Sequence, residues 1–165
     1  MPSAPATSPF RLDKRRVEAT LTLTTGRTIR GSFFLGETTM VGDGPERVDD
    51  LLNHTTGFFP FERLDNDQHR VVLYNTAHVT LVTLFGKEAR EVPGWEVAQV
   101  RYVSLILSGG EQVSGHVRVH QPDGRNRVSD WSHEPTVFRY VEITGSTLLV
   151  NINHVVEIIE REQRP

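Results

Sequence analysis

Apolar and polar residues alternate along two separate stretches of the chain, and a glycine interrupts each stretch. From Val17 to Thr24 every second residue is apolar, which is the period of a strand with one buried face. Residues Leu21–Gly31 read LTLTTGRTIRG and Leu105–Gly115 read LILSGGEQVSG, with leucines, glycines and a β-branched residue in register. A strand, a tight turn and a returning strand produce this pattern. The sequence therefore predicts the same β-hairpin twice.

The segments after each hairpin also recur in the same order. A helical turn is predicted at residues 47–54 and again at 127–131, and a third strand at 57–63 and 136–143. Two further short strands, joined by a tight turn, are predicted within 70–84 and within 146–159. The offset between the copies falls from 84 to 80 to 76 along the chain. We interpret both steps as shortened loops, at residues 36–46 and 64–69, with the strands keeping their lengths.

This order predicts an all-β protein with two tandem five-stranded small β-barrel modules and short helical turns. The predicted boundaries are a disordered tail at 1–13, a first barrel at 14–85, a linker at 86–96, a second barrel at 97–160 and a tail at 161–165. The first thirteen residues include three prolines among small residues, which disfavours a strand. A glycine within a strand, such as Gly31, indicates a bulge or a sharp bend.

The repeated order resembles the small five-stranded barrels of the SH3-like and Sm-like group. The residues that carry the resemblance are the glycine pairs Gly26–Gly31 and Gly110–Gly115 and the final strand–turn–strand segment. For true Sm proteins the resemblance implies a ring with RNA at the final turns. Residues 75–78 differ from the basic element of that turn, so no RNA-binding residue is carried over.

Composition narrows the classes of function. The 165-residue chain is 37% hydrophobic and has a net charge of −3, which gives no overall attraction to nucleic acid. The absence of cysteine excludes disulfides, thiolate metal sites and a cysteine nucleophile. No apolar run approaches the roughly 18 residues of a membrane span, and no secretory signal is present, so we expect a soluble, cytoplasmic protein. Motifs of phosphate, dinucleotide, zinc-protease and serine-hydrolase sites are missing, so we expect no enzymatic activity and no cofactor.

Two pairs of polar residues occur in both halves and are the candidate binding residues. They are Asn75 and His78 with Asn151 and His154, and Arg47 and Asp50 with Arg127 and Asp130. The histidines, related by a pseudo-two-fold axis, could bind a metal, a nucleotide edge or an acidic partner. In the structural alternative, which we favour, each asparagine caps the turn and each histidine fills a half-buried strand start and bonds a carbonyl. We expect each Arg-x-x-Asp pair to form a local clasp on one helical turn.

A third polar group lies on one predicted strand. His116, Arg118 and His120 alternate with valines and so share a face. The outer two are roughly 13 Å apart along a strand, too far to share a metal ion. We expect this to be a solvated face.

These observations favour a non-enzymatic binding or regulatory protein that mediates protein–protein interaction or self-assembly through duplicated modules. Open strand edges invite pairing between chains, and two related surfaces suit bridging. One alternative is RNA or other nucleic-acid binding through a basic stripe, formed by Lys14, Arg15, Arg16, Arg27, Arg30, Arg118, Arg125 and Arg127. A second is small-ligand binding between the halves near His78 and His154. We expect no membrane partner, and we expect functional residues in the loops at 36–46 and 64–69.

Overall fold

The structure is a computed structural model of the chain, and it describes residues 14–39, 44–89, 94–120 and 127–162. The predicted tail at 1–13, part of the predicted linker, parts of the two loops that precede the helices, and Arg125 lie outside the described residues.

Both halves of the chain have the same order of elements. The first half contains β1 (Arg15–Leu23), β2 (Thr28–Leu35), α1 (Val48–His54), β3 (Phe58–Asp65), β4 (Gln68–Asn75), η1 (Thr76–His78) and β5 (Val79–Leu84). The second contains β6 (Gln99–Leu107), β7 (Gln112–Val119), α2 (Val128–Ser132), β8 (Phe138–Ile143), β9 (Ser146–Asn151), η4 (Ile152–His154) and β10 (Val155–Arg161). Two short 3-10 turns, η2 (Gly86–Ala89) and η3 (Trp95–Val97), lie where the linker was predicted.

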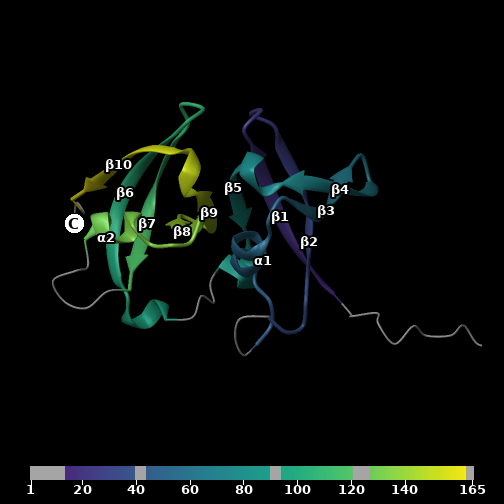
Figure 1. The fold of residues 1–165 in the computed structure, drawn as a ribbon, viewed down its shortest axis with the longest axis horizontal. Coiled ribbons are helices and arrows are strands. Elements are labelled where there is room, and N and C mark those ends of the chain that lie inside the picture. The colour runs from purple at the N-terminus through teal and green to yellow at the C-terminus, as the bar shows by residue number, and fades with distance from the viewer. Residues whose placement is uncertain (1–13, 40–43, 90–93, 121–126, 163–165) are drawn as a thin grey trace, which may run out of the picture.

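Within the described residues, the strands form one antiparallel sheet of ten strands in the order β10-β6-β7-β8-β9-β5-β1-β2-β3-β4. The all-β prediction is confirmed, but the sheet is open and the two separate closed barrels are not observed. Closing the first half would require β5 to pair with β4. The edge of β5 that is not bonded to β1 is bonded to β9 instead, so the two halves share one sheet (Figure 1).

In each half a glycine lets the second strand lie close to the backbone of the third strand, its neighbour in the sheet. A Cβ atom added to Gly31 would overlap the carbonyl oxygen of Glu62 on β3, and one on Gly115 would overlap that of Glu142 on β8. The ladder between β1 and β2 continues through Gly31 without a shift of register. The glycines therefore serve close backbone approach, and the predicted bulge at Gly31 is absent.

The two steps in the repeat offset have different structural origins. The segment between the second strand and the helix is shorter in the second half, 120–127 against 36–47, as predicted. The next step does not lie in a loop. Strands β3 and β4 have eight residues each, whereas β8 and β9 have six. The prediction that all strands kept their lengths is therefore wrong: the first half has a longer β3–β4 hairpin.

Two apolar clusters form the core, and each contains residues from both halves. Phe138 and Leu149 of the second half are buried in the cluster that otherwise belongs to the first half. Leu81 of the first half is buried in the cluster of the second half. Burial of such side chains stabilises a fold by roughly 1.5–3 kcal/mol each. The contact between the halves is therefore part of the core.

Candidate functional site

The contact between β5 and β9, which we call the joint, places the halves head to tail. Its ladder pairs Leu81 with Val150, Val82 with Leu149, Thr83 with Leu148 and Leu84 with Thr147. The fifth strand of one half thus pairs with the fourth strand of the other. A pseudo-two-fold axis would pair equivalent strands, so the predicted two-fold relation of the histidines is wrong.

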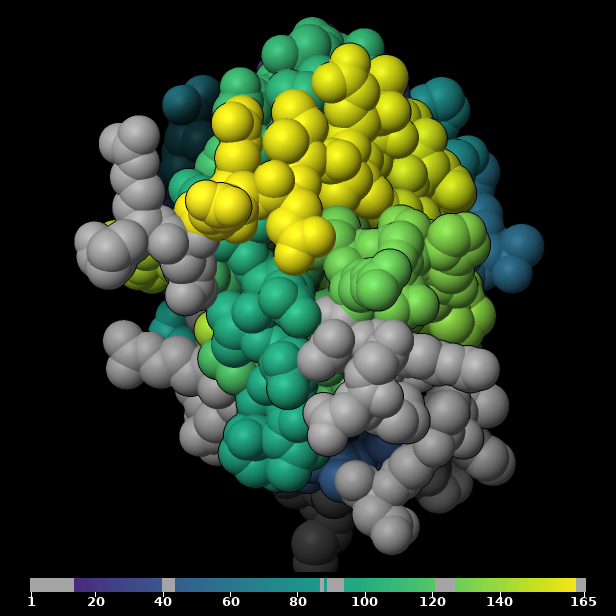
Figure 2. All heavy atoms as spheres, turned by 90° about the vertical axis from the view of Figure 1, so that its left-hand side faces the viewer, coloured from purple at the N-terminus to yellow at the C-terminus, as the bar shows by residue number. Residues whose placement is uncertain are grey.

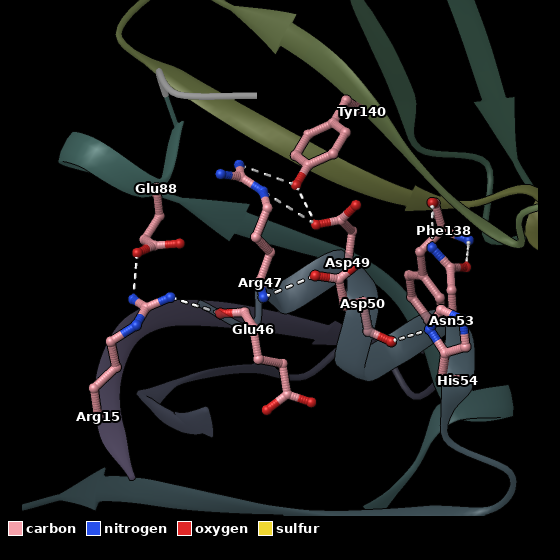
Figure 3. A network of polar contacts seen from close by, with 10 residues as sticks. All are labelled: Arg15, Glu46, Arg47, Asp49, Asp50, Asn53, His54, Glu88, Phe138 and Tyr140. Carbon is pink, nitrogen blue, oxygen red and sulfur yellow. Dashed lines mark hydrogen bonds and ion pairs between the residues drawn. The ribbon is translucent and has the colours of Figure 1, made fainter. Parts of the chain in front are cut away.

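Asn53 on α1 fastens the third strand of the second half to the first half (Figure 3). Its Oδ1 accepts hydrogen bonds from the backbone N–H groups of Val137 and Phe138 at 3.0 and 2.8 Å. Its Nδ2 donates to the carbonyl oxygen of Phe138 at 3.0 Å. One side chain therefore satisfies three backbone groups next to the joint.

A second polar contact joins the start of α1 to β8 (Figure 3). The hydroxyl of Tyr140 donates to Asp49 Oδ1 at 2.5 Å, and Arg47 Nη2 donates to the same hydroxyl at 3.4 Å. Burial raises the pKa of Tyr140 far above its usual range, and the Asp49 carboxylate raises it further. Burial also raises the pKa of Asp49, against the opposing effects of the Tyr140 hydroxyl and Arg47. The phenol therefore stays protonated and remains the donor.

The repeated Arg-x-x-Asp pairs cap the two helices. The backbone N–H of Arg47 donates to Asp50 Oδ2 at 3.0 Å, and that of Arg127 donates to Asp130 Oδ2 at 3.0 Å. The local clasp is therefore present, but the aspartate binds the arginine backbone, and the Arg47 guanidinium reaches β8 instead. A carboxylate in this position satisfies an N–H group that has no partner within the helix.

The repeated Asn-x-x-His pairs have equivalent local contacts but different surroundings. Asn75 Oδ1 accepts from Ala77 N–H at 3.0 Å, and Asn151 Oδ1 accepts from Asn153 N–H at 3.1 Å, so both cap a turn as expected. At the joint, Asn151 Nδ2 also donates to the Val79 carbonyl at 2.9 Å, and His154 Nε2 lies 2.7 Å from the Ala77 carbonyl. His78 is exposed, so its predicted half-buried position is wrong.

The sheet ends in two open edges, β4 and β10, which lie at opposite ends of the molecule (Figure 1). At the β4 end Phe58, Val71 and Leu73 have 62%, 57% and 62% of their surface exposed. On β10, Val156 and Ile159 are 65% and 37% exposed. Figure 2 looks onto the β10 end, where this strand (yellow) lies at the surface next to α2 (green). Large apolar side chains therefore face solvent along both edges.

Four of the eight basic residues proposed as a stripe are paired with acids. Arg15 bonds Glu88 at 2.5 Å, Arg16 lies 3.2 Å from Glu62, Arg30 bonds Glu18 at 2.6 Å and Arg118 bonds Glu142 at 2.7 Å. These contacts neutralise cations that phosphate binding would need.

The strand that carries His116 and Arg118 lines a cavity of about 100 Å³ together with Asp49, Trp95 and Tyr140. His116 and Arg118 are half-buried, so the predicted solvated face is wrong for both. The Arg118 guanidinium lies 4.6 Å from the centre of the Trp95 ring and donates to the Trp95 carbonyl at 2.8 Å. The guanidinium also donates to both carboxylate oxygens of Glu142 on β8, so Arg118 holds η3 against the sheet.

Arg139 in the second half was not identified as a candidate residue from the sequence. Arg139 on β8 is 5% exposed, donates to the Thr136 carbonyl at 2.7 Å, and also bonds the carbonyls of Trp131 and Glu134. The first half has Phe59 at this position. The sequence signal for this contact was an arginine at a position where the other half has a core aromatic residue. A buried cation needs hydrogen-bond acceptors such as these carbonyl groups.

No group of three potential metal ligands occurs among the described residues. None of the helices in those residues is long and apolar enough to cross a membrane. The chain matches no protein-family model, no curated protein and no solved structure.

Proposed function

We propose that this protein is a non-enzymatic binding protein that associates with polypeptide through the open edges of its sheet. The two halves are, in this proposal, a tandem duplication of one five-stranded SH3-like or Sm-like module. An edge strand offers unpaired N–H and C=O groups, and a partner strand that adds to it gains a ladder of hydrogen bonds.

The observation that carries the proposal is the exposure of Phe58 and Leu73. Phe58 on β3 and Leu73 on β4 occupy the positions that Phe138 and Leu149 occupy on β8 and β9, because Phe58 pairs with Asn75 as Phe138 pairs with Asn151. Phe138 and Leu149 are 3% and 0% exposed, because the other half covers them, whereas Phe58 and Leu73 are each 62% exposed. The first half therefore exposes two apolar residues whose counterparts in the second half are buried against the other half.

Light scattering across a range of protein concentrations tests the proposal. We expect the apparent mass to rise with concentration, and Leu73→Lys to abolish the rise because a charge would enter the apolar contact. Val97→Lys is the matched control, since Val97 is 80% exposed but lies in η3 and belongs to neither edge strand. A chain that stays monomeric and binds no polypeptide through β4 would contradict the proposal.

A further inference from the structure

We propose that the partner of β4 is β10 of a second copy of this chain, paired in the register that β9 and β5 use at the joint. The inference rests on the proposed function and names the partner. Strand β4 is the counterpart of β9, and β10 is the counterpart of β5, by their places in the order of elements. Each chain therefore has both strands of a second joint, and in the sheet formed by the described residues β4 and β10 are the two end strands.

The joint specifies the register between two copies. Residues 147–150 of β9 correspond to 71–74 of β4, because Asn151 and Asn75 both pair with the first residue of the third strand. Residues 81–84 of β5 correspond to 157–160 of β10, because both strands carry a register shift at the same place, next to Val79 and Val155. The predicted pairs are Val71 with Glu160, Val72 with Ile159, Leu73 with Ile158 and Tyr74 with Glu157.

At two of the four predicted pairs, the side chains fit a joint of this kind. Leu149 lies opposite Val82 in the joint, and Leu73 would lie opposite Ile158, so an apolar pair replaces an apolar pair. The joint pairs Thr83 with Leu148, whereas the proposed contact pairs Ile159 with Val72. The contact between chains is therefore more apolar at this position. Phe58 would insert where Phe138 inserts in the joint.

The polar residues at the end of β4 are also placed for this contact. Asn151 donates to the carbonyl of Val79 across the joint, and the counterparts of these two residues are Asn75 and Val155. His154 lies against the Ala77 carbonyl, and the counterparts are His78 and Asn153. The repeated Asn-x-x-His pair would thus make the same contacts in both places, once within a chain and once between chains.

The arrangement favours a second copy over an unrelated protein and fixes the kind of assembly. The two edges lie at opposite ends of the sheet, so a chain cannot pair its own β4 with its own β10 (Figure 1). Head-to-tail contacts of this type give rings when the rotation closes and filaments when it does not.

Glu157 and Glu160 occupy the positions on β10 that Leu81 and Leu84 occupy on β5. Charges on an edge strand disfavour indiscriminate pairing with other sheets.

Single cysteines test the register directly, because the natural chain contains no cysteine. Val71→Cys and Glu160→Cys lie at exposed positions and face each other in the proposed contact. Paired residues in antiparallel strands have Cα atoms about 4.5–5.5 Å apart, within disulfide reach. When the two variants are mixed under mild oxidation, we expect a disulfide-linked dimer. Val71→Cys mixed with Val156→Cys is the control, since Val156 is also exposed on β10 but lies four residues from Glu160, roughly 13 Å along the strand.

The outcomes separate this inference from the proposed function. Linkage of the Val71→Cys and Glu160→Cys mixture about tenfold faster than the control, and than either variant alone, supports head-to-tail pairing. Rapid linkage of Val71→Cys with itself would show that β4 pairs with β4 and would overturn the inference while association stands. An oligomer in which Val71→Cys links to neither strand would do the same. A chain that is monomeric at every concentration and forms no linkage would overturn the inference, and it would overturn the proposed function as well if no other polypeptide binds through β4.

Discussion

At the scale of single residues, equal positions in the two halves have unequal surroundings. Asn75 and Asn151 cap equivalent turns, yet only Asn151 is buried, at 1% exposure, and also donates across the joint. A buried group left without its partner costs about 1–3 kcal/mol, whereas a lost cap costs about 1 kcal/mol. Comparing the effects of substitution at Asn75 and at Asn151 therefore isolates the contribution of the joint to stability.

We expect Asn151→Ala to lower the free energy of unfolding by about 2–3 kcal/mol and Asn75→Ala by about 1 kcal/mol. Urea denaturation at a protein concentration below the onset of association measures both. If β4 pairs between chains, Asn75→Ala also weakens association by more than its small effect on folding explains. Equal losses of stability in the two variants would contradict the assigned role of Asn151.

Asp49 should make stability depend on pH. Burial raises its pKa in the folded chain, so the folded state binds this proton more tightly than the unfolded state does. The stability that this group contributes is complete below its unfolded pKa, near 3.9, and is lost as pH rises through the folded pKa. Asp49→Asn has no titrating group at this position. The stability of the natural chain relative to the variant should therefore fall as pH rises above about 4.

Urea denaturation at several pH values between 4 and 7 measures this difference. Tyr140→Phe is an informative companion, because the Tyr140 hydroxyl lowers the pKa of Asp49. Without that hydrogen bond the pKa of Asp49 rises further, and the fall in stability should extend to higher pH. Parallel stability curves for the natural chain and Asp49→Asn would show that Asp49 titrates alike in the folded and unfolded states.

At the scale of elements, local patterns predicted the strands but not their partners. Alternation from Val17 and the glycine turns identified the hairpins, because one buried face and a tight turn are local properties. Whether the sheet is open or closed depends on which strand pairs with the free edge of β5. The strand that does so, β9, is far from β5 in the sequence. Asn53 and Tyr140 were missed for the same reason, since their partners lie 84 to 91 positions away.

One sequence signal for the joint was present in the strands themselves. Strands buried on both faces read as continuous apolar runs, and β9 contains Leu148-Leu149-Val150. Strand β4 has the run Val71-Val72-Leu73-Tyr74, yet its residues are exposed or half-buried, whereas five of the six residues in β9 are buried. Strand β4 therefore has the composition of a buried strand although it lies at the open edge of the sheet, which agrees with the proposed pairing.

At the scale of the whole molecule, the joint within a chain has polar interactions that the proposed contact between chains lacks. Tyr140 on β8 and Asp49 on α1 bond across the joint. The counterparts of these residues are Pro60 on β3 and Ser129 on α2, which cannot form this hydrogen bond. The contact between chains should therefore be the weaker of the two, so that chains stay intact units and associate reversibly.

Transferring the missing interaction should strengthen association. We expect Pro60→Tyr combined with Ser129→Asp to raise the association constant by about tenfold or more, since a hydrogen bond to a charged group contributes about 1.5–3 kcal/mol. Sedimentation or light scattering of the double variant and both single variants forms a cycle that isolates the new pair from the separate effects of each substitution. Mixing the two single variants should also give stronger association than either alone, because the tyrosine and the aspartate lie on different chains in the contact. A double variant that associates no better than the sum of the single changes would mean that β3 of one copy does not approach α2 of another.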